Sequence, residues 1–266
     1  MQLVLARVGR SGILRPIMSN VLAVIPARYG STRLPGKVLA DLGGKPLVWH
    51  VHRRAAQARL VDETVVATDD HRVVDALRPY GVPVMLTRGD HPTGTDRLAE
   101  VAERHPSDIV VNVQGDEPLI DPGTIDAAVR PLLADPALPM ATVRHRIRDA
   151  RRIGDPNVVK VVCDGRGRAL YFSRSPIPHV RDAAPEPPPI YWQHVGLYAY
   201  RREFLLQFAS LPQTQLEKAE KLEQLRALEH GFPIGVVETE HESIGVDTLD
   251  DLERVRRQLA IYGEAA

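Results

Sequence analysis

The stretch VLAVIPARYGSTRLPGKVLADLGGKPLVWHV, residues 21–51, decides the fold, because it joins a buried strand to a basic loop and then to a helix. Residues 21–25 form an apolar run of the kind that fills a parallel strand. Arg28, Arg33 and Lys37 follow in a loop where Gly30 and Gly36 let backbone amides approach a ligand closely. This layout is typical of an anion site, and a polyphosphate fits it.

The loop is not a P-loop. Gly30 and Gly36 enclose five residues, where a P-loop has four, and Val38 stands where the metal-binding Ser or Thr belongs. The alternative is a basic surface turn after an edge strand. Three cations within ten residues repel one another in a purely structural turn, and Pro26 and Pro35 stiffen the connection. A phosphate-binding role is therefore favoured.

Composition indicates an ordinary globular protein: 266 residues, 44% hydrophobic and 26% charged. Lys plus Arg number 34, as do Asp plus Glu, so no global field attracts the chain to nucleic acid or to an anionic membrane. The single cysteine, Cys163, excludes an intrachain disulfide and a multi-cysteine metal site, and it indicates the cytoplasm. We expect neither a nucleic-acid partner nor membrane insertion, since no apolar run approaches the ~20 residues of a membrane span.

The two ends of the chain define the expected bounds of the domain. Residues 1–18 carry three arginines and no sustained apolar period, which favours a disordered extension. A single domain is expected over residues 19–262.

Strand and helix patterns alternate through the first half. Strands are expected at residues 64–68, 82–86 and 109–113, and helices at residues 46–59, 71–80 and 96–104. This rhythm predicts an α/β fold with a doubly wound, mostly parallel mixed sheet. Ligands on such sheets bind at the carboxyl ends of the strands, where the polar clusters at residues 26–37, 67–70 and 114–118 lie.

The second half changes character. A β-hairpin excursion is expected, with strands at residues 158–163 and 169–172 around the turn DGRG at residues 164–167. The proline-rich residues 175–190 predict a long loop. The remaining expected elements are strands at residues 140–147, 194–200 and 234–239, a helix at residues 216–229 and a last helix capped near Thr248.

Two aspartates are candidate magnesium ligands. Asp116 follows the most hydrophobic strand, next to the basic loop, and Asp247 in IGVDT stands at another strand end. Mg²⁺ prefers one or two carboxylates together with phosphate oxygens. The alternative is that Asp116 sits in a turn and Asp247 caps the last helix. Their joint occurrence with the phosphate loop favours the metal.

Eight motifs together resemble a known family, the 3-deoxy-D-manno-octulosonate (Kdo) cytidylyltransferases. They span residues 21–259 in order: IPARYGSTRLPGK, VVATDD, HPTGTDRLAE, VNVQGDEP, PNVVKVV, ALYFSR, LEKAEKLEQLR and GVDTLDDLERVR. The resemblance implies a nucleotidyltransferase fold, a homodimer, and a Mg²⁺-dependent condensation of CTP with Kdo. The products would be CMP-Kdo, for lipopolysaccharide-type polymers, and pyrophosphate.

The resemblance also implies roles for individual residues. Arg28, Arg33 and Lys37, with Gly30, Ser31 and Thr32, would hold the triphosphate, and Ala67, Thr68, Asp69, Gly94 and Thr95 would line the cytosine and ribose. Asp116 and Asp247 would bind Mg²⁺ and, with Arg33 and Lys37, form the catalytic set. The sugar acid would face Gln114, Arg174, His194, Tyr198, Glu217 and Glu220, with Arg174 paired to its carboxylate.

Several alternatives stay open at this point. His194 could be a packed strand histidine, and Glu217 and Glu220 could lie on a solvated helix face. Gln193 stands where many members of the family carry a basic residue, and the prolines of residues 183–189 are unusual there, which leaves the sugar open to amino-Kdo or a sialic acid. A glycosyltransferase would need a clear DxD-type metal motif, and an inactive nucleotide-binding subunit would be expected to lack Lys37, Asp116 or Asp247.

Overall fold

The computed structural model describes residues 6–8, 14–16, 19–30, 34–181, 190–242 and 244–262. Contacts within the chain divide it into two compact units, where the sequence analysis expected a single domain. Unit 1 comprises Met1–Asp126 and Ser243–Ala266, and unit 2 comprises Ala127–Glu242. No helix among the described residues is long and apolar enough to cross a membrane.

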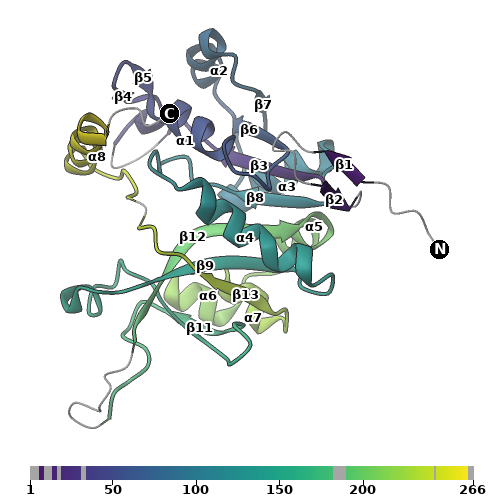
Figure 1. The fold of residues 1–266 in the computed structure, drawn as a ribbon, viewed down its shortest axis with the longest axis vertical. Coiled ribbons are helices and arrows are strands. Elements are labelled where there is room, and N and C mark those ends of the chain that lie inside the picture. Colours follow the sequence, from purple (N-terminus) through teal and green to yellow (C-terminus); the bar gives the residue numbers. More distant parts are fainter. Residues whose placement is uncertain are drawn as a thin grey trace. The chain divides into compact units, whose positions relative to one another are not determined.

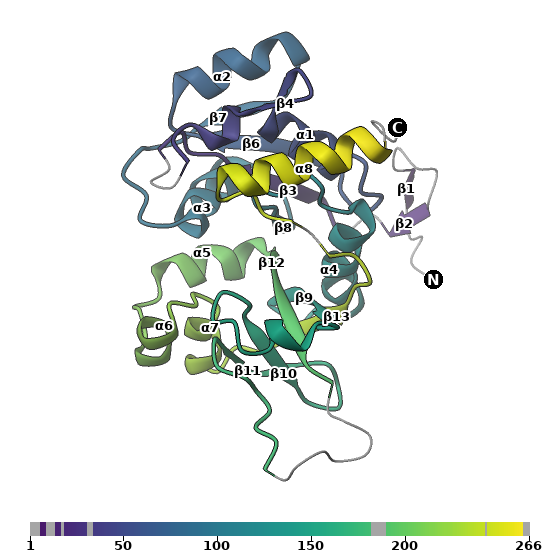
Figure 2. The ribbon, with the colours of Figure 1, turned by 90° about the vertical axis from the view of Figure 1, so that its left-hand side faces the viewer.

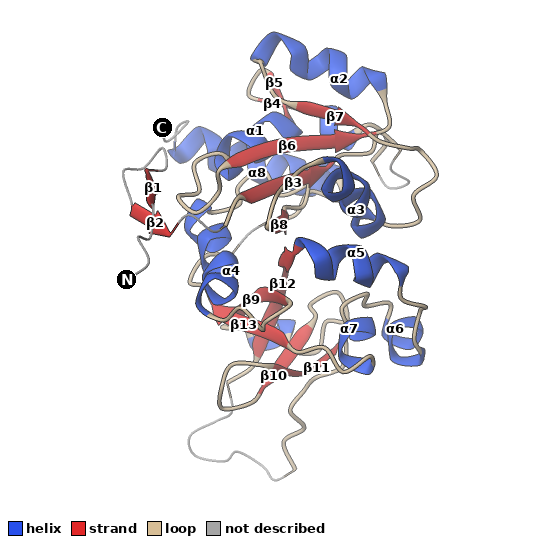
Figure 3. Ribbon diagram, turned by 90° about the vertical axis from the view of Figure 1, so that its right-hand side faces the viewer, coloured by secondary structure: helices blue, strands red, loops and turns tan. Residues whose placement is uncertain are grey.

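Unit 1 contains the parallel sheet (Figures 1 and 3). Its strands lie in the order β8 (Ile109–Asn112), β3 (Val21–Pro26), β6 (Glu63–Thr68), β7 (Val84–Leu86), and each neighbouring pair is parallel. The side chains of β3 from Val21 to Ile25 are almost fully buried, as a strand covered by helices on both faces requires. The doubly wound α/β class is thereby confirmed.

Helices and short strands complete unit 1. They are α1 (Leu47–Ala55), α2 (His71–Leu77), α3 (Gly94–Arg104), the start of α4 (Pro122–Ala134), α8 (Leu249–Tyr262), the 3₁₀ turns Lys37–Leu39 and Arg78–Tyr80, and the pair β4 (Asp41–Leu42) and β5 (Lys45–Pro46). The helix expected at residues 71–80 ends in the second 3₁₀ turn because Pro79 lacks the N–H of an α-helix. Within residues 1–18, expected to be disordered, β1 (Ala6–Val8) and β2 (Leu14–Pro16) form an antiparallel pair.

Unit 2 is built on a largely antiparallel sheet (Figure 2). Its strands lie in the order β11 (Ala169–Ser173), β10 (Lys160–Cys163), β12 (Trp192–Arg201), β9 (Met140–Arg146), β13 (Ile234–Glu238), and only the last pair is parallel. The hairpin of β10 and β11 confirms the predicted excursion. Its turn closes through Gly167, whose φ of 75° suits glycine.

The helices of unit 2 depart from the sequence-based expectation. The helix expected at residues 216–229 is two helices, α6 (Gln215–Glu220) and α7 (Leu225–Glu229), because Lys221 adopts a left-handed conformation and ends α6. α4 and α5 (Arg202–Ser210), together with the 3₁₀ turn Ala150–Arg152, had no counterpart among the expected elements.

Candidate active site

A cavity of about 390 Å³ lies in unit 1, where β3 and β8 end. Five segments line it: the loop after β3, the 3₁₀ turn that follows, the approach to α3 with its first turn, the loop after β8 and the segment before α8. The lining residues are Pro26, Arg28, Gly30, Lys37, Val38, His91, Thr93, Gly94, Arg97, Gln114, Gly115, Asp116 and Asp247.

Lys37 forms ion pairs with both aspartates that line this cavity. Its Nζ donates to Asp116 Oδ2 at 2.6 Å, to Asp247 Oδ1 at 2.9 Å and to the carbonyl of Val246 at 3.2 Å. Burial by itself lowers the pKa of Lys37, but the two carboxylates outweigh it and the pKa is raised. The ammonium therefore stays charged and holds two carboxylates that come from segments far apart in the sequence.

Close backbone packing brings these groups together. The N–H of Val246 donates to the carbonyl of Asp116 at 2.8 Å, which ties the segment before α8 to the loop after β8. A Cβ atom on Gly115 would lie 2.5 Å from the carbonyl oxygen of Pro26, closer than real Cβ contacts allow. Gly115 is thus required for the loop after β8 to pass the end of β3.

The phosphate-loop candidate is closed at its base by Tyr29 and Gly36. Gly36 N–H donates to the carbonyl of Tyr29 at 3.1 Å, and a Cβ on Gly36 would lie 3.1 Å from the Tyr29 ring. The Arg72 guanidinium lies 3.5 Å from the centre of that ring, and it is held in turn by Asp70, whose Oδ1 accepts from Arg72 Nε at 2.9 Å. The loop therefore rests on α2. Ser31, Thr32 and Arg33 lie outside the described residues.

The predicted nucleotide-binding residues are only partly brought to the cavity. Arg28, Gly30 and Gly94 line it, but Ala67 and Thr68 are fully buried, and Thr95 is almost so. The Thr68 carbonyl accepts from the backbone N–H and the hydroxyl of Thr87, so this residue connects β6 to the chain after β7.

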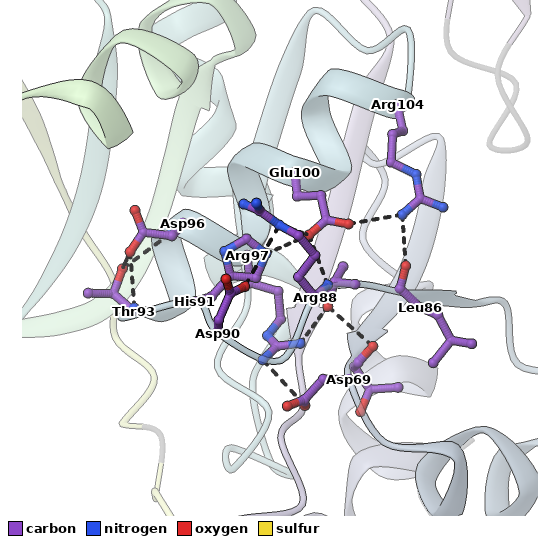
Figure 4. Close-up of polar contacts among 12 residues, drawn as sticks. Asp69, Leu86, Arg88, Asp90, His91, Thr93, Asp96, Arg97, Glu100 and Arg104 are labelled. Atoms are coloured by element: carbon purple, nitrogen blue, oxygen red, sulfur yellow. Dashed lines mark hydrogen bonds and ion pairs between the residues drawn. The ribbon is translucent and has the colours of Figure 1, made fainter.

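The wall formed by α3 and the chain before it carries residues that the sequence analysis missed (Figure 4). His91 and Arg97 line the cavity, and Thr93 caps α3 in a capping box with Asp96. His91 Nε2 lies 2.5 Å from Glu100 Oε2. The motif HPTGTDRLAE contains all of these residues, so its polar side chains were the signal in the sequence that could have identified this wall.

In unit 2, the His194 side chain is packed within the sheet, and its contact with the sugar acid stays a prediction. Its Nε2 lies 3.0 Å from the Thr142 hydroxyl, and its ring meets Phe172 edge-on with centroids 5.0 Å apart. Burial lowers the pKa of His194 to about 3, so the ring is neutral. Tyr198 lies beside it at 5.3 Å between ring centroids, and burial, followed by the charge of Glu223, raises the pKa of Tyr198 well above its ordinary value.

The two predicted sugar-facing glutamates have internal partners. Glu217 is buried and accepts from Arg226 Nε at 2.8 Å and Nη2 at 2.6 Å, so the solvated helix face that was the alternative for it is wrong. Glu220 accepts from the Ser173 hydroxyl at 2.6 Å and from the Arg174 backbone N–H at 2.9 Å. Both carboxylates thereby stabilise the packing of α6.

The Arg174 side chain points its donors at backbone carbonyls. Nε donates to Glu220 at 2.7 Å, Nη1 to Pro156 at 2.9 Å and Nη2 to Lys221 at 3.4 Å. The fully buried Lys160 ammonium also donates to carbonyls, among them that of Val158 at 2.6 Å. In this structure Arg174 joins α6 to the loop before β10, and its pairing with a sugar carboxylate stays a prediction.

The donor set at Asp116 and Asp247 suits a hard divalent cation. Asp116 Oδ2 and Asp247 Oδ1 both accept from Lys37 Nζ, so the two carboxylates lie close enough together to share a cation, and both line the cavity. No cluster of three or more His, Cys, Asp or Glu side chains that could hold a metal occurs in the described part of the chain. A magnesium site does not need three such side chains, because Mg²⁺ commonly binds one or two carboxylates and completes its coordination shell with water and phosphate oxygens.

A family model described as cytidylyltransferase matches residues 22–243. The 3-deoxy-manno-octulosonate cytidylyltransferase of Geobacter sulfurreducens is 58% identical over 248 residues, which cover 90% of this chain and 99% of the relative. The protein of the same name from Solibacter usitatus is 56% identical over 238 residues, covering 90% of this chain and 94% of that one.

Solved structures agree with these relatives. The structure of a CMP:2-keto-3-deoxy-manno-octonic acid synthetase complexed with CTP matches with a TM-score of 0.87 and 47% identity, covering 92% of this chain and all of the other. A 4-diphosphocytidyl-2C-methyl-D-erythritol synthase from Anaerococcus prevotii, at 16% identity and a TM-score of 0.59, shares the fold over 91% of this chain and 96% of its own. This chain therefore belongs to the cytidylyltransferase family, alongside the 3-deoxy-manno-octulosonate cytidylyltransferases.

Proposed function

We propose that this protein transfers CMP from CTP to the anomeric hydroxyl of Kdo, giving CMP-Kdo and pyrophosphate. The observation that carries the proposal is the convergence of Lys37, Asp116 and Asp247 in a cavity that Arg28 also lines. The relatives that bear this activity in their names match nine-tenths of the chain. The product would serve lipopolysaccharide-type polymer synthesis.

The reaction is a direct displacement. The anomeric hydroxyl oxygen attacks the α-phosphorus of CTP in line, and the bond from that phosphorus to the oxygen shared with the β-phosphorus breaks. Pyrophosphate leaves, and the hydroxyl proton passes to solvent. Arg28 and Lys37 line the cavity, and their charges would neutralise the oxygens of a triphosphate bound there, while the cavity would supply positioning. No covalent enzyme intermediate is required, and burial raises the pKa of Cys163, which makes its thiol a poor nucleophile.

Asp116 and Asp247 would hold Mg²⁺, which supplies charge stabilisation for the triphosphate. In the structure both carboxylates neutralise Lys37, so a bound cation would compete for them and leave the lysine ammonium available to phosphate oxygens. We also propose a cytoplasmic homodimer, on the strength of the family resemblance.

The test is pyrophosphate release by the purified protein with Mg²⁺ and each of CTP, UTP, ATP and GTP, combined with Kdo, amino-Kdo or N-acetylneuraminic acid. Turnover of CTP with Kdo, and a new CMP-sugar by mass spectrometry, is the expected result. If another acidic sugar were preferred, the proposed acceptor Kdo would be wrong and the proposed transfer of CMP would stand. The absence of turnover with every pair of nucleotide and sugar would refute the proposal that this protein is a nucleotidyltransferase.

A further inference from the structure

A second cavity of unit 1, with a volume of about 960 Å³, lies where β6 begins. Leu22 near the start of β3 lines it, whereas Pro26 at the other end of β3 lines the active-site cavity, and the two cavities share no lining residue. Its walls include the last turn of α1 with the chain after it, the first residues of β6, all of β7 and the end of α3. A cavity of this size is large enough for a small organic molecule.

Two buried polar atoms in this wall lack a hydrogen-bond partner. The Thr64 hydroxyl, on a residue only 9% exposed, and Nδ1 of His105 form no hydrogen bond with any residue that the structure describes. Buried polar atoms are almost always paired, so these two beside a cavity indicate a wall that a bound molecule completes. Apolar side chains of β7 adjoin them: Val84 and Met85 line the cavity, as does Leu86, which is 39% exposed.

The ionic side chains of the wall leave an excess of negative charge. Asp62 and Glu63 are exposed carboxylates that line the cavity, and the Glu63 side chain is 59% exposed. The lining arginines are Arg59 and Arg104. Arg104 is already balanced by Glu100, whose Oε1 accepts from Arg104 Nη1 at 3.2 Å (Figure 4). Two carboxylates therefore face one remaining guanidinium.

Two helix ends add partial negative charge. α1 ends at Ala55 and α3 ends at Arg104, so both helices end in the cavity wall, and helix C-termini favour cations. His52, which also lines the cavity, does not offset this charge, because burial lowers its pKa below the ordinary value and its ring is neutral at pH 7. The cavity therefore suits a positive group on an apolar body.

The unpaired nitrogen of His105 points to the same chemistry. His105 Nε2 lies 3.4 Å from Glu63 Oε2, an arrangement in which Nε2 donates to the carboxylate and Nδ1 is an acceptor. An ammonium group supplies the donor that Nδ1 lacks, directly or through a water molecule, and it also pairs with the carboxylate.

We propose that this second cavity binds a small organic cation, an amine with an alkyl or aryl body. The ammonium lies at Glu63, and the hydrocarbon covers Val84, Met85 and Leu86. The site exists whether or not the chain transfers CMP, because it shares no lining residue with the active-site cavity.

Three probes with the same six-carbon chain separate charge from hydrocarbon. Hexylamine, hexan-1-ol and hexanoate are titrated into the isotope-labelled full chain at pH 7, and amide chemical shifts give the affinities. Hexylamine is expected to bind with a Kd on the order of 1 mM, as about seven non-hydrogen atoms allow, and hexanoate at least about fivefold more weakly. The shifts should centre on Thr64 and Val84. No hexylamine binding, equal binding of hexanoate, or shifts confined to other parts of the chain would overturn the proposal.

Glu63→Gln tests the charge. It is expected to weaken hexylamine binding by about threefold and to leave hexan-1-ol binding unchanged, because an exposed ion pair contributes modestly and only the charge is removed. The matched control is Glu103→Gln, at an exposed glutamate of α3 that does not line the cavity, and it should leave both affinities unchanged. Equal weakening of hexylamine in the two variants would reveal a general effect of surface charge and overturn the proposal.

Ala56→Trp tests the cavity itself. Ala56 is exposed and lines the cavity, so an indole at this position fills space that the hydrocarbon needs. Both hexylamine and hexan-1-ol are expected to bind at least about tenfold more weakly, and retained binding would place the probes elsewhere and overturn the proposal. If thermal melting shows that this variant does not fold, the comparison of Glu63→Gln with Glu103→Gln decides alone. Displacement of hexylamine by saturating CTP would place the amine in the active-site cavity and also overturn the proposal.

Discussion

The charged side chains of the two units are arranged for different purposes. In unit 1, Lys37 holds Asp116 and Asp247, whose side chains are 29% and 40% exposed, so a ligand can reach and exchange these contacts. In unit 2, Glu217 and Arg226 pair at 2.6 Å with both side chains 6% exposed. The comparison teaches that an ion cluster open to a cavity can serve chemistry, whereas a closed one holds a fold together.

The largest expected effect is on the open cluster. Asp116→Asn is expected to lower kcat by at least about 10²-fold, on the order of 3 kcal/mol, because it removes a charge needed at the phosphates. Thermal melting should show that the fold persists. The control is Asp41→Asn, at an exposed position outside the cavity. Near-normal turnover of Asp116→Asn at saturating Mg²⁺ would show that the open cluster of unit 1 does not serve the chemistry.

The closed cluster should respond in stability. Glu217→Gln is expected to lower the free energy of unfolding by about 2 kcal/mol, because Arg226 loses its charged partner in a buried place. Urea unfolding measures this loss. The double variant Glu217→Gln with Arg226→Met should recover part of it. A raised KM for Kdo with unchanged stability would instead place Glu217 at the sugar.

His194 makes the stability of the fold depend on pH. Its pKa in the folded protein is about 3, below the ordinary value, so the unfolded chain binds the proton more readily. The stabilisation is therefore complete above about pH 6.5 and is lost as pH falls towards 3, by up to ~1.4 kcal/mol per pH unit. Urea unfolding at a series of pH values gives the free energy of unfolding as a function of pH. Between pH 3 and 6.5 this free energy should depend less steeply on pH in His194→Gln than in the wild type. An unchanged slope would mean that His194 is accessible to protons.

The smallest expected effect sharpens the description of the open site. Arg72→Gln removes the cation over the Tyr29 ring and should raise the KM for CTP by a few fold, with kcat nearly unchanged, because the loop is held less firmly. Steady-state kinetics with CTP varied provides the measurement, and Arg78→Gln, an exposed arginine in the turn after α2, is the control. Equal behaviour of both variants would show that the stacking does not matter.

The residues of the open cluster, Lys37, Asp116 and Asp247, could be predicted from the sequence because their signals are local. Lys37 follows a glycine in a basic loop, and Asp116 follows an apolar strand, so each residue type stands at a recognisable place. The motif that contains Arg97 was recognised, but the contacts of Arg97 were not predicted, because its partners Asp69 and Thr87 come from other segments. The break between α6 and α7 was also missed, since a left-handed lysine leaves no mark in a helical pattern.

By itself, the sequence determined the α/β class, the strand ends that carry the site and the family, because periodicity, glycine spacing and ordered motifs are properties of neighbouring residues. Only the tertiary structure decided which charges meet. It paired Lys37 with Asp116 and Asp247, enclosed Glu217 with Arg226, and directed Arg174 at backbone carbonyls. The physical reason is that burial and distance set the strength of an ionic contact, and both are fixed by packing between segments far apart in the chain.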